Sequence, residues 1–234
     1  MEPLRVELEM PLGEGRWRVV VQGEKPVANL LAEHGQAPLP PYIKEPLNRP
    51  EEYQTVYCRE PGSAAAPTAG LHFTSDLLGR AGRRGIEIVR VTLHVGLDTF
   101  RPIQAESVEE HEIHQEWYTV RPEELARLNA ARSEGRRLIA VGTTAVRVLE
   151  TLYAGSAPGG PARGPVQGWT GLYITPGHEF RAVDALITNF HLPRTSLLAL
   201  VMAFAGVHRI REAYGQAVAC GYRFFSFGDA MLIE

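Results

Sequence analysis

A short polar segment between two apolar runs carries the side chains with the widest chemical range in this sequence. From Gly171 to Gly206 the chain reads GLYITPGHEFRAVDALITNFHLPRTSLLALVMAFAG. The eleven-residue stretch 184–194 contains a carboxylate, a hydroxyl, a carboxamide, an imidazole and a guanidinium, on Asp184, Thr188, Asn189, His191 and Arg194. Polar groups beside a rigid apolar scaffold are typical of an active-site wall. The alternative is a buried strand followed by turn residues that satisfy only local backbone groups.

A second candidate is the start of a predicted helix. The expected strand 138–141 runs into Gly142, Thr143 and Thr144, which places free backbone N–H groups and two hydroxyls at the positive end of a helix. Arg147 follows Thr143 by four residues and faces the same side of that helix. The pattern favours an anion site, although an ordinary capped helix explains it about as well.

Histidines supply a third set of candidates. His111, His114 and Glu116 form an HxxHxE group, in which spacing identifies no third metal ligand, so a role in hydrogen bonding or substrate positioning is favoured over a metal site. His72 follows a loop of small residues, and His94 lies near the end of an expected strand. Both are places where α/β folds present side chains to a crevice, and a hydrogen-bonded core histidine is the alternative for each.

An aromatic group lies near the C-terminus, just before Asp229. Tyr222, Phe224, Phe225 and Phe227 can stack an unpaired RNA base or simply form core. On an expected strand, alternation places Tyr222 and Phe224 on one face and the other two rings on the opposite face. At most one face is then available to RNA.

Eight blocks in one order resemble the S-adenosylmethionine:tRNA ribosyltransferase-isomerase family of queuosine biosynthesis. The blocks extend from Pro38 almost to the C-terminus. They are PLPPYI (38–43), YQTVY (53–57), AAPTAGLHF (65–73), VTLHVGLDTFRP (91–102), HEIHQEWY (111–118), AVGTTAVRVLE (140–150), VDALITNFHLPRTSLLALVMAFAG (183–206) and YRFFSFGDAMLI (222–233).

The resemblance implies a reaction that fits these residue types. The ribosyl part of S-adenosylmethionine is moved and isomerised onto an aminomethyl-deazaguanine at the tRNA wobble position, giving epoxyqueuosine-tRNA, adenine and methionine. Such steps need a general base, a donor to the leaving adenine and groups that orient hydroxyls. Six residues are the expected catalytic candidates: His72, His94, Asp184, Asn189, His191 and Asp229.

Substrate binding is expected from a further eight residues. At the helix start, the resemblance favours a site for the methionine carboxylate or a tRNA phosphate. The eight residues are Thr143, Thr144, Arg147, His111, His114, Glu116, Arg194 and Tyr222. S-adenosylmethionine is the expected co-substrate, with no cofactor and no metal, and the expected partner is a tRNA with a GUN-type anticodon. Two rivals stay open: an inactive tRNA-binding remnant and a histidine-dependent metallohydrolase.

Composition limits the classes of protein to which this chain can belong. The chain has 234 residues, 44% of them hydrophobic, and a formal charge of −3, so tRNA binding is permitted rather than indicated. Arginines do cluster locally, at 80–84, 132–137 and 209–211. No apolar run is long enough to cross a bilayer, and the N-terminus lacks the pattern of a secretory signal. Cys58 and Cys220 have no CxxC partner, and we expect a cytoplasmic protein that is a monomer.

The elements that must position these residues alternate between strands and helices. Helices are expected at 26–34, 51–57, 75–83, 122–133, 143–153, 197–205 and 209–220, with strands at 86–95, 115–120, 138–141 and 185–187 and a terminal pair around 228–229. This rhythm predicts an α/β fold with a mainly parallel sheet and flanking helices over residues 37–234. The loop 155–168 is expected to be too rich in glycine and proline to pack.

The N-terminal strands have a different expected origin. Residues 4–22 alternate around a turn at 11–15 and predict two strands, which alone do not form a stable sheet. The resembling family begins with a longer N-terminal portion that includes a small β-barrel domain. We therefore expect residues 1–36 to be the tail of that barrel with a connecting helix, and the chain to lack the rest.

Overall fold

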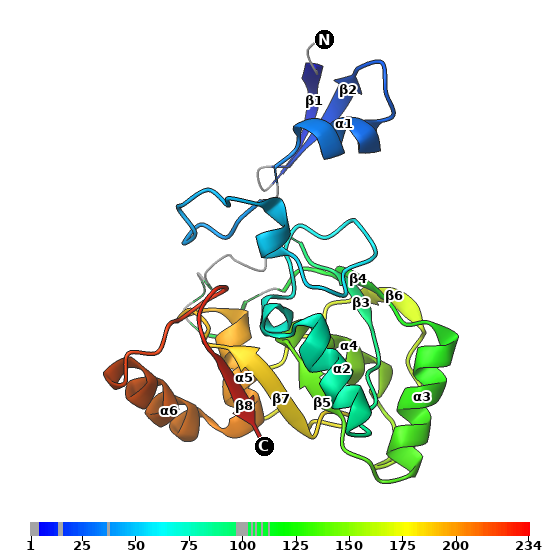
Figure 1. Ribbon diagram of the computed structural model, residues 1–234, viewed down its shortest axis with the longest axis vertical. Coiled ribbons are helices and arrows are strands. Elements are labelled where there is room, and N and C mark those ends of the chain that lie inside the picture. The colour runs from blue at the N-terminus through cyan, green and yellow to red at the C-terminus, as the bar shows by residue number, and fades with distance from the viewer. Residues whose placement is uncertain are drawn as a thin grey trace. The chain divides into compact units, whose positions relative to one another are not determined.

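The computed structural model describes residues 5–13, 16–36, 38–96, 103, 105, 107–108, 110–111 and 113–234. Residues 97–102, which belong to the fourth block, lie outside this part. The chain divides into two compact units, Met1–Pro38 and Leu39–Glu234 (Figure 1). Among the described residues, no helix combines the length and the apolar character needed to cross a bilayer.

The first unit is a hairpin followed by a helix. Strand β1 (Arg5–Gly13) pairs antiparallel with β2 (Arg16–Gln22), as the alternation predicted, and α1 (Val27–His34) begins after Pro26. Val6 pairs with Val21 and Leu8 with Val19, yet Val6, Leu8 and Val19 remain 41–59% exposed. A barrel origin for this hairpin stays a prediction.

The second unit contains two small sheets. In one, β3 (Thr92–His94), β4 (Glu116–Thr119) and β6 (Gln167–Thr170) form an antiparallel sheet in the order β3-β4-β6. In the other, β5 (Ile139–Val141) pairs parallel with β7 (Ala185–Asn189), and β8 (Ala230–Ile233) pairs antiparallel with β7. The mixed α/β class is confirmed.

The expected mainly parallel sheet is wrong. Only the β5–β7 pair is parallel among the described strands, because the other strands return beside their neighbours in the opposite direction. The expected strand 86–95 shortens to β3, with Ile86 57% exposed. The expected terminal pair reduces to β8, because the residues before it form turns around the left-handed Phe225.

Five helices of the second unit lie close to their predicted bounds. They are α2 (Ser75–Arg83), α3 (Pro122–Ser133), α4 (Thr143–Leu152), α5 (Ser196–Ala205) and α6 (Val207–Ala219). The expected helix 51–57 is wrong: a single 3-10 turn, η1 (Pro50–Tyr53), takes its place. A second 3-10 turn, η2 (Thr68–His72), follows the small-residue loop.

Helix α4 is the centre of the core. Val146, Val148 and Leu152 have no exposed surface, and Figure 1 shows α4 behind β5 and β7. The buried carboxylate of Glu150 accepts backbone N–H groups from Arg181, Ala182 and Val183, which fixes the approach to β7. Most of the loop 155–168 is exposed, but the N–H groups of residues 163 and 164 donate to the Leu152 carbonyl and tie the loop to the end of α4.

The N-terminus of α5 provides a test of local stability. The Thr195 side chain accepts the N–H of Leu198 at 3.3 Å and donates to the Leu192 carbonyl at 2.8 Å. We expect Thr195→Ala to lower the free energy of unfolding by about 1 kcal/mol, because an N-cap hydroxyl contributes about that much. Thr195→Ser retains the hydroxyl and should unfold close to the wild type in urea. Equal losses for both variants would show that the threonine methyl group, rather than the cap, stabilises this turn.

Candidate active site

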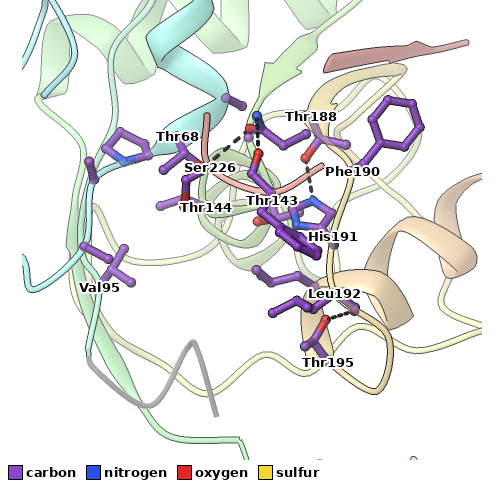
Figure 2. Close-up of a pocket in the computed structure, with 18 of the residues that line it drawn as sticks. Thr68, Val95, Thr143, Thr144, Thr188, Phe190, His191, Leu192, Thr195 and Ser226 are labelled. Atoms are coloured by element: carbon purple, nitrogen blue, oxygen red, sulfur yellow. Dashed lines mark hydrogen bonds between the residues drawn. The ribbon is translucent and has the colours of Figure 1, made fainter. Parts of the chain in front are cut away.

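A pocket of about 70 Å³ opens where β5 and β7 end. Among the residues that the structure describes, its lining contains no Asp, Glu, Lys or Arg, and its polar groups are mainly hydroxyls and amides (Figure 2). The lining residues are Tyr42, Ala65, Ala66, Pro67, Thr68, Ala69, Val95, Gly142, Thr143, Thr144, Thr188, Asn189, Phe190, His191, Leu192, Thr195, Leu197, Phe225 and Ser226. Such a lining suits a polar ligand without formal charge.

The register of the parallel pair brings two polar segments together. Val141 lies opposite Ile187, and the N–H of Gly142 donates to the Ile187 carbonyl at 2.8 Å. The chain then turns at Gly142, whose φ of 87° favours glycine, and enters α4 at Thr143. The hydroxyls of Thr143 and Thr144 therefore share the pocket with the end of β7.

Asn189 is the most connected polar side chain at this end of β7. It is 2% exposed, and its Nδ2 atom lies 3.2 Å from the Phe225 carbonyl and 3.1 Å from Nε2 of His72. Its Oδ1 atom accepts a hydrogen bond of 3.4 Å from the Thr68 hydroxyl. Asn189 thus connects η2, β7 and the turn before β8.

His191 lines the pocket and is held at two points. Its Nε2 atom lies 2.8 Å from the Thr188 hydroxyl, a contact drawn as a dashed line in Figure 2, and its backbone N–H donates to the Tyr214 hydroxyl at 2.8 Å. Burial lowers the pKa of His191 to about 4 and raises the pKa of Tyr214 to about 12. Both groups are therefore neutral near neutral pH.

Tyr42 and Ser226 close another side of the pocket. Their hydroxyls lie 2.8 Å apart although 184 positions separate them in sequence, and the Tyr42 ring packs on Phe225 with centroids 4.9 Å apart. Neither residue was among the predicted site residues. Both lie within blocks of the family resemblance, which was the signal that pointed to them.

A buried ion pair joins β4 to α4 behind the pocket. The Glu116 carboxylate contacts Arg147, accepts the Gly96 N–H at 3.0 Å and lies 3.0 Å from Nε2 of His114. Burial raises the pKa of Glu116, but His114 and Arg147 outweigh it, so the pKa is lowered overall. Arg147 also donates to the carbonyls of Leu172 and Thr170. Its guanidinium therefore anchors α4 to neighbouring backbone, and direct ligand contact stays a prediction.

Comparison with known proteins identifies the family of this chain. The model for the queuosine biosynthesis protein family matches residues 4–233. The chain belongs to the queuosine biosynthesis protein family. Among curated relatives, it is 60% identical over 205 residues to an S-adenosylmethionine:tRNA ribosyltransferase-isomerase of Symbiobacterium thermophilum, covering 88% of this chain and 59% of that protein.

Two further comparisons agree. A Moorella thermoacetica protein of the same name is 55% identical over 236 residues, covering 98% of this chain and 66% of that protein. The crystal structure of an S-adenosylmethionine tRNA ribosyltransferase from Thermotoga maritima matches with a TM-score of 0.55 and 44% identity, covering 71% of this chain and 51% of that one. The chain thus spans about three fifths to two thirds of the length of these two curated relatives.

Every lining residue in the described part of the chain lies in one of the eight blocks that resemble this family. Six blocks contribute, at 38–43, 65–73, 91–102, 140–150, 183–206 and 222–233. Residues far apart in the chain therefore converge on one cavity. This convergence makes the pocket the candidate active site.

The structure brings some predicted catalytic residues together and separates others. Asn189 and His191 line the pocket, and His72 contacts Asn189 from outside the lining. Asp184 lies at the opposite end of β7, roughly 16 Å away for five residues of extended chain, where it accepts the Leu138 N–H at 2.7 Å. An active-site role for Asp184 beside Asn189 is therefore at odds with the fold, because the strand runs straight between them.

The remaining predicted catalytic residues also lie outside the pocket lining. His94 stacks on Trp117 with centroids 5.3 Å apart. The carboxylate of Asp229 accepts the backbone N–H of Arg223 at 2.7 Å and a side-chain hydrogen bond at 3.3 Å. The backbone hydrogen bond, which is the largest cause, lowers the pKa of Asp229, and this carboxylate closes the turn before β8.

The predicted binding residues divide in the same way. Thr143 and Thr144 line the pocket, while His114 and Arg147 line a smaller cavity of about 20 Å³ that shares Leu197 with it. The His111 ring packs on Tyr173, and Tyr222 is 51% exposed beside Phe190. Within the described part of the chain, no three His, Cys, Asp or Glu side chains are arranged to hold a metal ion.

The arginine cluster at 132–137 is largely paired with carboxylates. Arg136 contacts Glu134 and Glu87, and Arg137 contacts Glu234. Partners of opposite charge at 2.6–2.9 Å weaken the field that these arginines present to a phosphate. Arg209 and Arg211 lie exposed on α6 without a carboxylate partner in the described residues.

Backbone conformation marks both sides of the pocket. Arg194 (φ 57°) and Phe225 (φ 72°) are the non-glycine residues with positive φ among those described. Phe225 lines the pocket, and Arg194 lies exposed between the lining residues Leu192 and Thr195. A left-handed L-residue costs roughly 1–2 kcal/mol, and such strain concentrates at functional sites.

The conformation of Arg194 can be tested by stability. We expect Arg194→Gly to unfold within about 1 kcal/mol of the wild type, because relief of the left-handed strain and the extra entropy of unfolded glycine oppose each other. Arg194→Val should lose about 1–2 kcal/mol more, since a β-branched side chain resists positive φ. Urea unfolding provides the measurement. Equal stabilities of the two variants would contradict the left-handed assignment.

The neutrality of His191 predicts how stability depends on pH. Its folded pKa of about 4 lies below the ordinary value of 6.5, so the unfolded chain binds more protons between these values. The stabilisation is therefore complete above about pH 6.5 and is lost as the pH falls toward 4. We expect the wild type to lose about 2 kcal/mol more than His191→Gln between about pH 7.5 and pH 5. Parallel pH profiles would show that His191 is solvated.

Proposed function

We propose that this chain transfers and isomerises the ribosyl moiety of S-adenosylmethionine onto 7-aminomethyl-7-deazaguanine at the wobble position of tRNA. The products are epoxyqueuosine-tRNA, adenine and methionine. One observation carries the proposal: all the described residues that line the pocket come from the blocks that resemble the ribosyltransferase-isomerase family. The curated relatives at 55–60% identity bear that enzyme's name.

The chemistry of the pocket agrees with a nucleoside ligand. Ribose and purine rings are polar but uncharged, and they are recognised by hydroxyl, amide and imidazole groups rather than by ion pairs. The described lining offers hydroxyl and amide groups on Tyr42, Thr143, Thr188, Asn189 and Ser226, none of which carries a formal charge. We assign the pocket to the nucleoside part of S-adenosylmethionine or to the deazaguanine.

His191 is the best-placed group for proton transfer in this proposal. It lines the pocket, and its imidazole is neutral above its pKa of about 4. A neutral imidazole accepts a proton, such as the acidic C5′ proton beside a sulfonium. The Thr188 hydroxyl at 2.8 Å orients the ring. The threonines at the start of α4 then orient the ribose hydroxyls.

The remaining features of the proposal concern partners and setting. The tRNA is expected to carry a GUN-type anticodon, S-adenosylmethionine serves as co-substrate, and the protein acts as a monomer in the cytoplasm. The exposed arginines on α6 are better placed for a phosphate contact than the paired Arg136 and Arg137. The N-terminal hairpin is proposed to be part of a small β-barrel domain.

Adenine release provides the direct test. In single-turnover reactions with S-adenosylmethionine and precursor tRNA, we expect His191→Ala to slow adenine release by about 10²–10⁴, the usual contribution of a proton-transfer group. Asp184→Asn is the matched control, because it alters a polar residue at the far end of the same strand.

The outcomes separate the alternatives. tRNA binding without adenine release in the wild type would favour the inactive remnant. Loss of activity in Asp184→Asn but not in His191→Ala would place the active site elsewhere. Stoichiometric zinc or iron in the purified protein, with hydrolase activity, would favour the metallohydrolase.

A further inference from the structure

The contact between His72 and Asn189 determines which nitrogen of His72 carries its proton. Nε2 of His72 lies 3.1 Å from Nδ2 of Asn189. An amide nitrogen only donates and an amide oxygen only accepts. The state of the imidazole therefore follows once the orientation of the amide is known.

Two neighbours fix that orientation. The Phe225 carbonyl lies 3.2 Å from Nδ2 of Asn189, and a carbonyl can only accept, so this side of the amide must be the nitrogen. The Thr68 hydroxyl lies 3.4 Å from Oδ1, where it can donate. Turning the amide over would set its oxygen against the Phe225 carbonyl inside a site where Asn189 is only 2% exposed. Such an unpaired contact is costly to bury.

We propose that Asn189 is a positioning residue that holds neutral His72 in the tautomer with the proton on Nδ1, so that His72 offers the substrate a hydrogen-bond donor. Nε2 accepts from Asn189, which leaves the single proton of the neutral ring on Nδ1. The assignment rests on the three atoms that surround the Asn189 amide: the Phe225 carbonyl, the Thr68 hydroxyl and Nε2 of His72.

The left-handed backbone of Phe225 helps to position the carbonyl that orients the Asn189 amide. Its left-handed φ of 72° accompanies a hydrogen bond from its own N–H to the Phe190 carbonyl at 2.9 Å, so the turn is anchored to the residue after Asn189. The anchored turn presents the carbonyl that orients the amide. The Phe225 turn therefore acts on the His72 tautomer through the Asn189 amide.

Nδ1 of His72 is available for a ligand. The side chain is exposed at the end of η2, and within the described part of the chain Nδ1 has no hydrogen-bond partner. The carboxylate of Asp229 is close enough to interact electrostatically with His72, but both of its oxygens already accept from Arg223. A protonated Nδ1 can donate to an acceptor on a ligand, such as a purine ring nitrogen or a hydroxyl oxygen.

This inference deepens the proposed function and rests on it for the identity of the ligand. It divides the roles of the two histidines at this end of β7: His191 accepts a proton within the pocket, whereas His72 donates a hydrogen bond. His72 cannot accept a proton on Nε2 without losing the hydrogen bond from Asn189.

The tautomer can be measured without any enzymatic assay. Long-range ¹H–¹⁵N NMR of the ¹⁵N-labelled protein distinguishes a protonated ring nitrogen from an unprotonated one, and the His72→Gln variant assigns the His72 signals. At a pH where His72 is neutral, we expect a protonated Nδ1 and an unprotonated Nε2. In Asn189→Ala, His72 should shift toward the Nε2-protonated form that a free histidine side chain prefers.

A matched control variant tests whether the Asn189 amide itself determines the His72 tautomer. Thr68→Val removes only the hydroxyl at Oδ1, so the Phe225 contact should still hold the amide and the Nδ1 proton should remain. Should Asn189→Ala fail to fold, the wild-type spectrum alone decides. Protonated Nε2 in the wild type overturns the proposal, and so does an unchanged tautomer in folded Asn189→Ala.

Two substitutions then test the donor role. In His72→Asn, the side-chain amide nitrogen takes the place of Nδ1 and can still donate. In His72→Gln, the side-chain amide lies near the position of Nε2, so the donor at Nδ1 is lost. We expect adenine release by His72→Asn to stay within about tenfold of the wild type, the usual effect of a neutral hydrogen bond, and His72→Gln to be slower than His72→Asn. Faster release by His72→Gln, or a loss of about hundredfold or more in both variants, overturns the donor role. A wild type that releases no adenine would contradict the proposed function, while the NMR result would still decide the tautomer.

Discussion

The parallel pairing of β5 with β7 is the constraint on which the candidate active site depends. Because the two strands run in the same direction, they end at the same edge, and the residues that follow each strand meet there. The hydrogen bond from Gly142 to Ile187 sets the register at this edge. A shift of one residue in the β5–β7 register would move each side chain of β7 to the other face of the sheet. Thr188 and Asn189 would then leave their present positions, and the shared pocket would be lost.

Buried polar groups around this edge are matched to partners. Asn189 has three contacts, and Glu116 is surrounded by Arg147, His114 and the Gly96 N–H. Breaking one partner of a buried pair leaves the other uncompensated, which costs more than the net value of the pair. The start of α4, which lines the pocket, is therefore held in part by an ion pair that joins α4 to β4.

Much of the fold could be predicted from the sequence, because local signals agree with the structure. The helix expected at 75–83 is α2, and Thr74, a residue type that favours this position, caps it by accepting the Leu77 N–H. The sheet topology could not be predicted in this way. The strand and helix predicted over 138–153 are present as β5 and α4. A single strand–helix unit, however, does not show that β8 pairs antiparallel with β7.

The candidate active site was predicted only in part, because local sequence signals do not show which distant residues meet. Asp184 and Asn189 are neighbours in sequence, but a straight strand places them at opposite ends, and sequence spacing alone hides this. Tyr42 and Ser226 meet across 184 positions, and no local pattern predicts that contact. The left-handed conformation of Phe225 could not be predicted either, because phenylalanine rarely adopts it and only the tertiary fold imposes it.

A crystal structure of the protein with S-adenosylmethionine or its neutral relative 5′-methylthioadenosine tests the central claim most directly. If the pocket at the ends of β5 and β7 is the nucleoside site, the ribose or the purine will lie within hydrogen-bond distance of Thr143, Thr188 or Asn189 and in contact with His191. Ligand bound elsewhere, with these side chains untouched, would contradict the account.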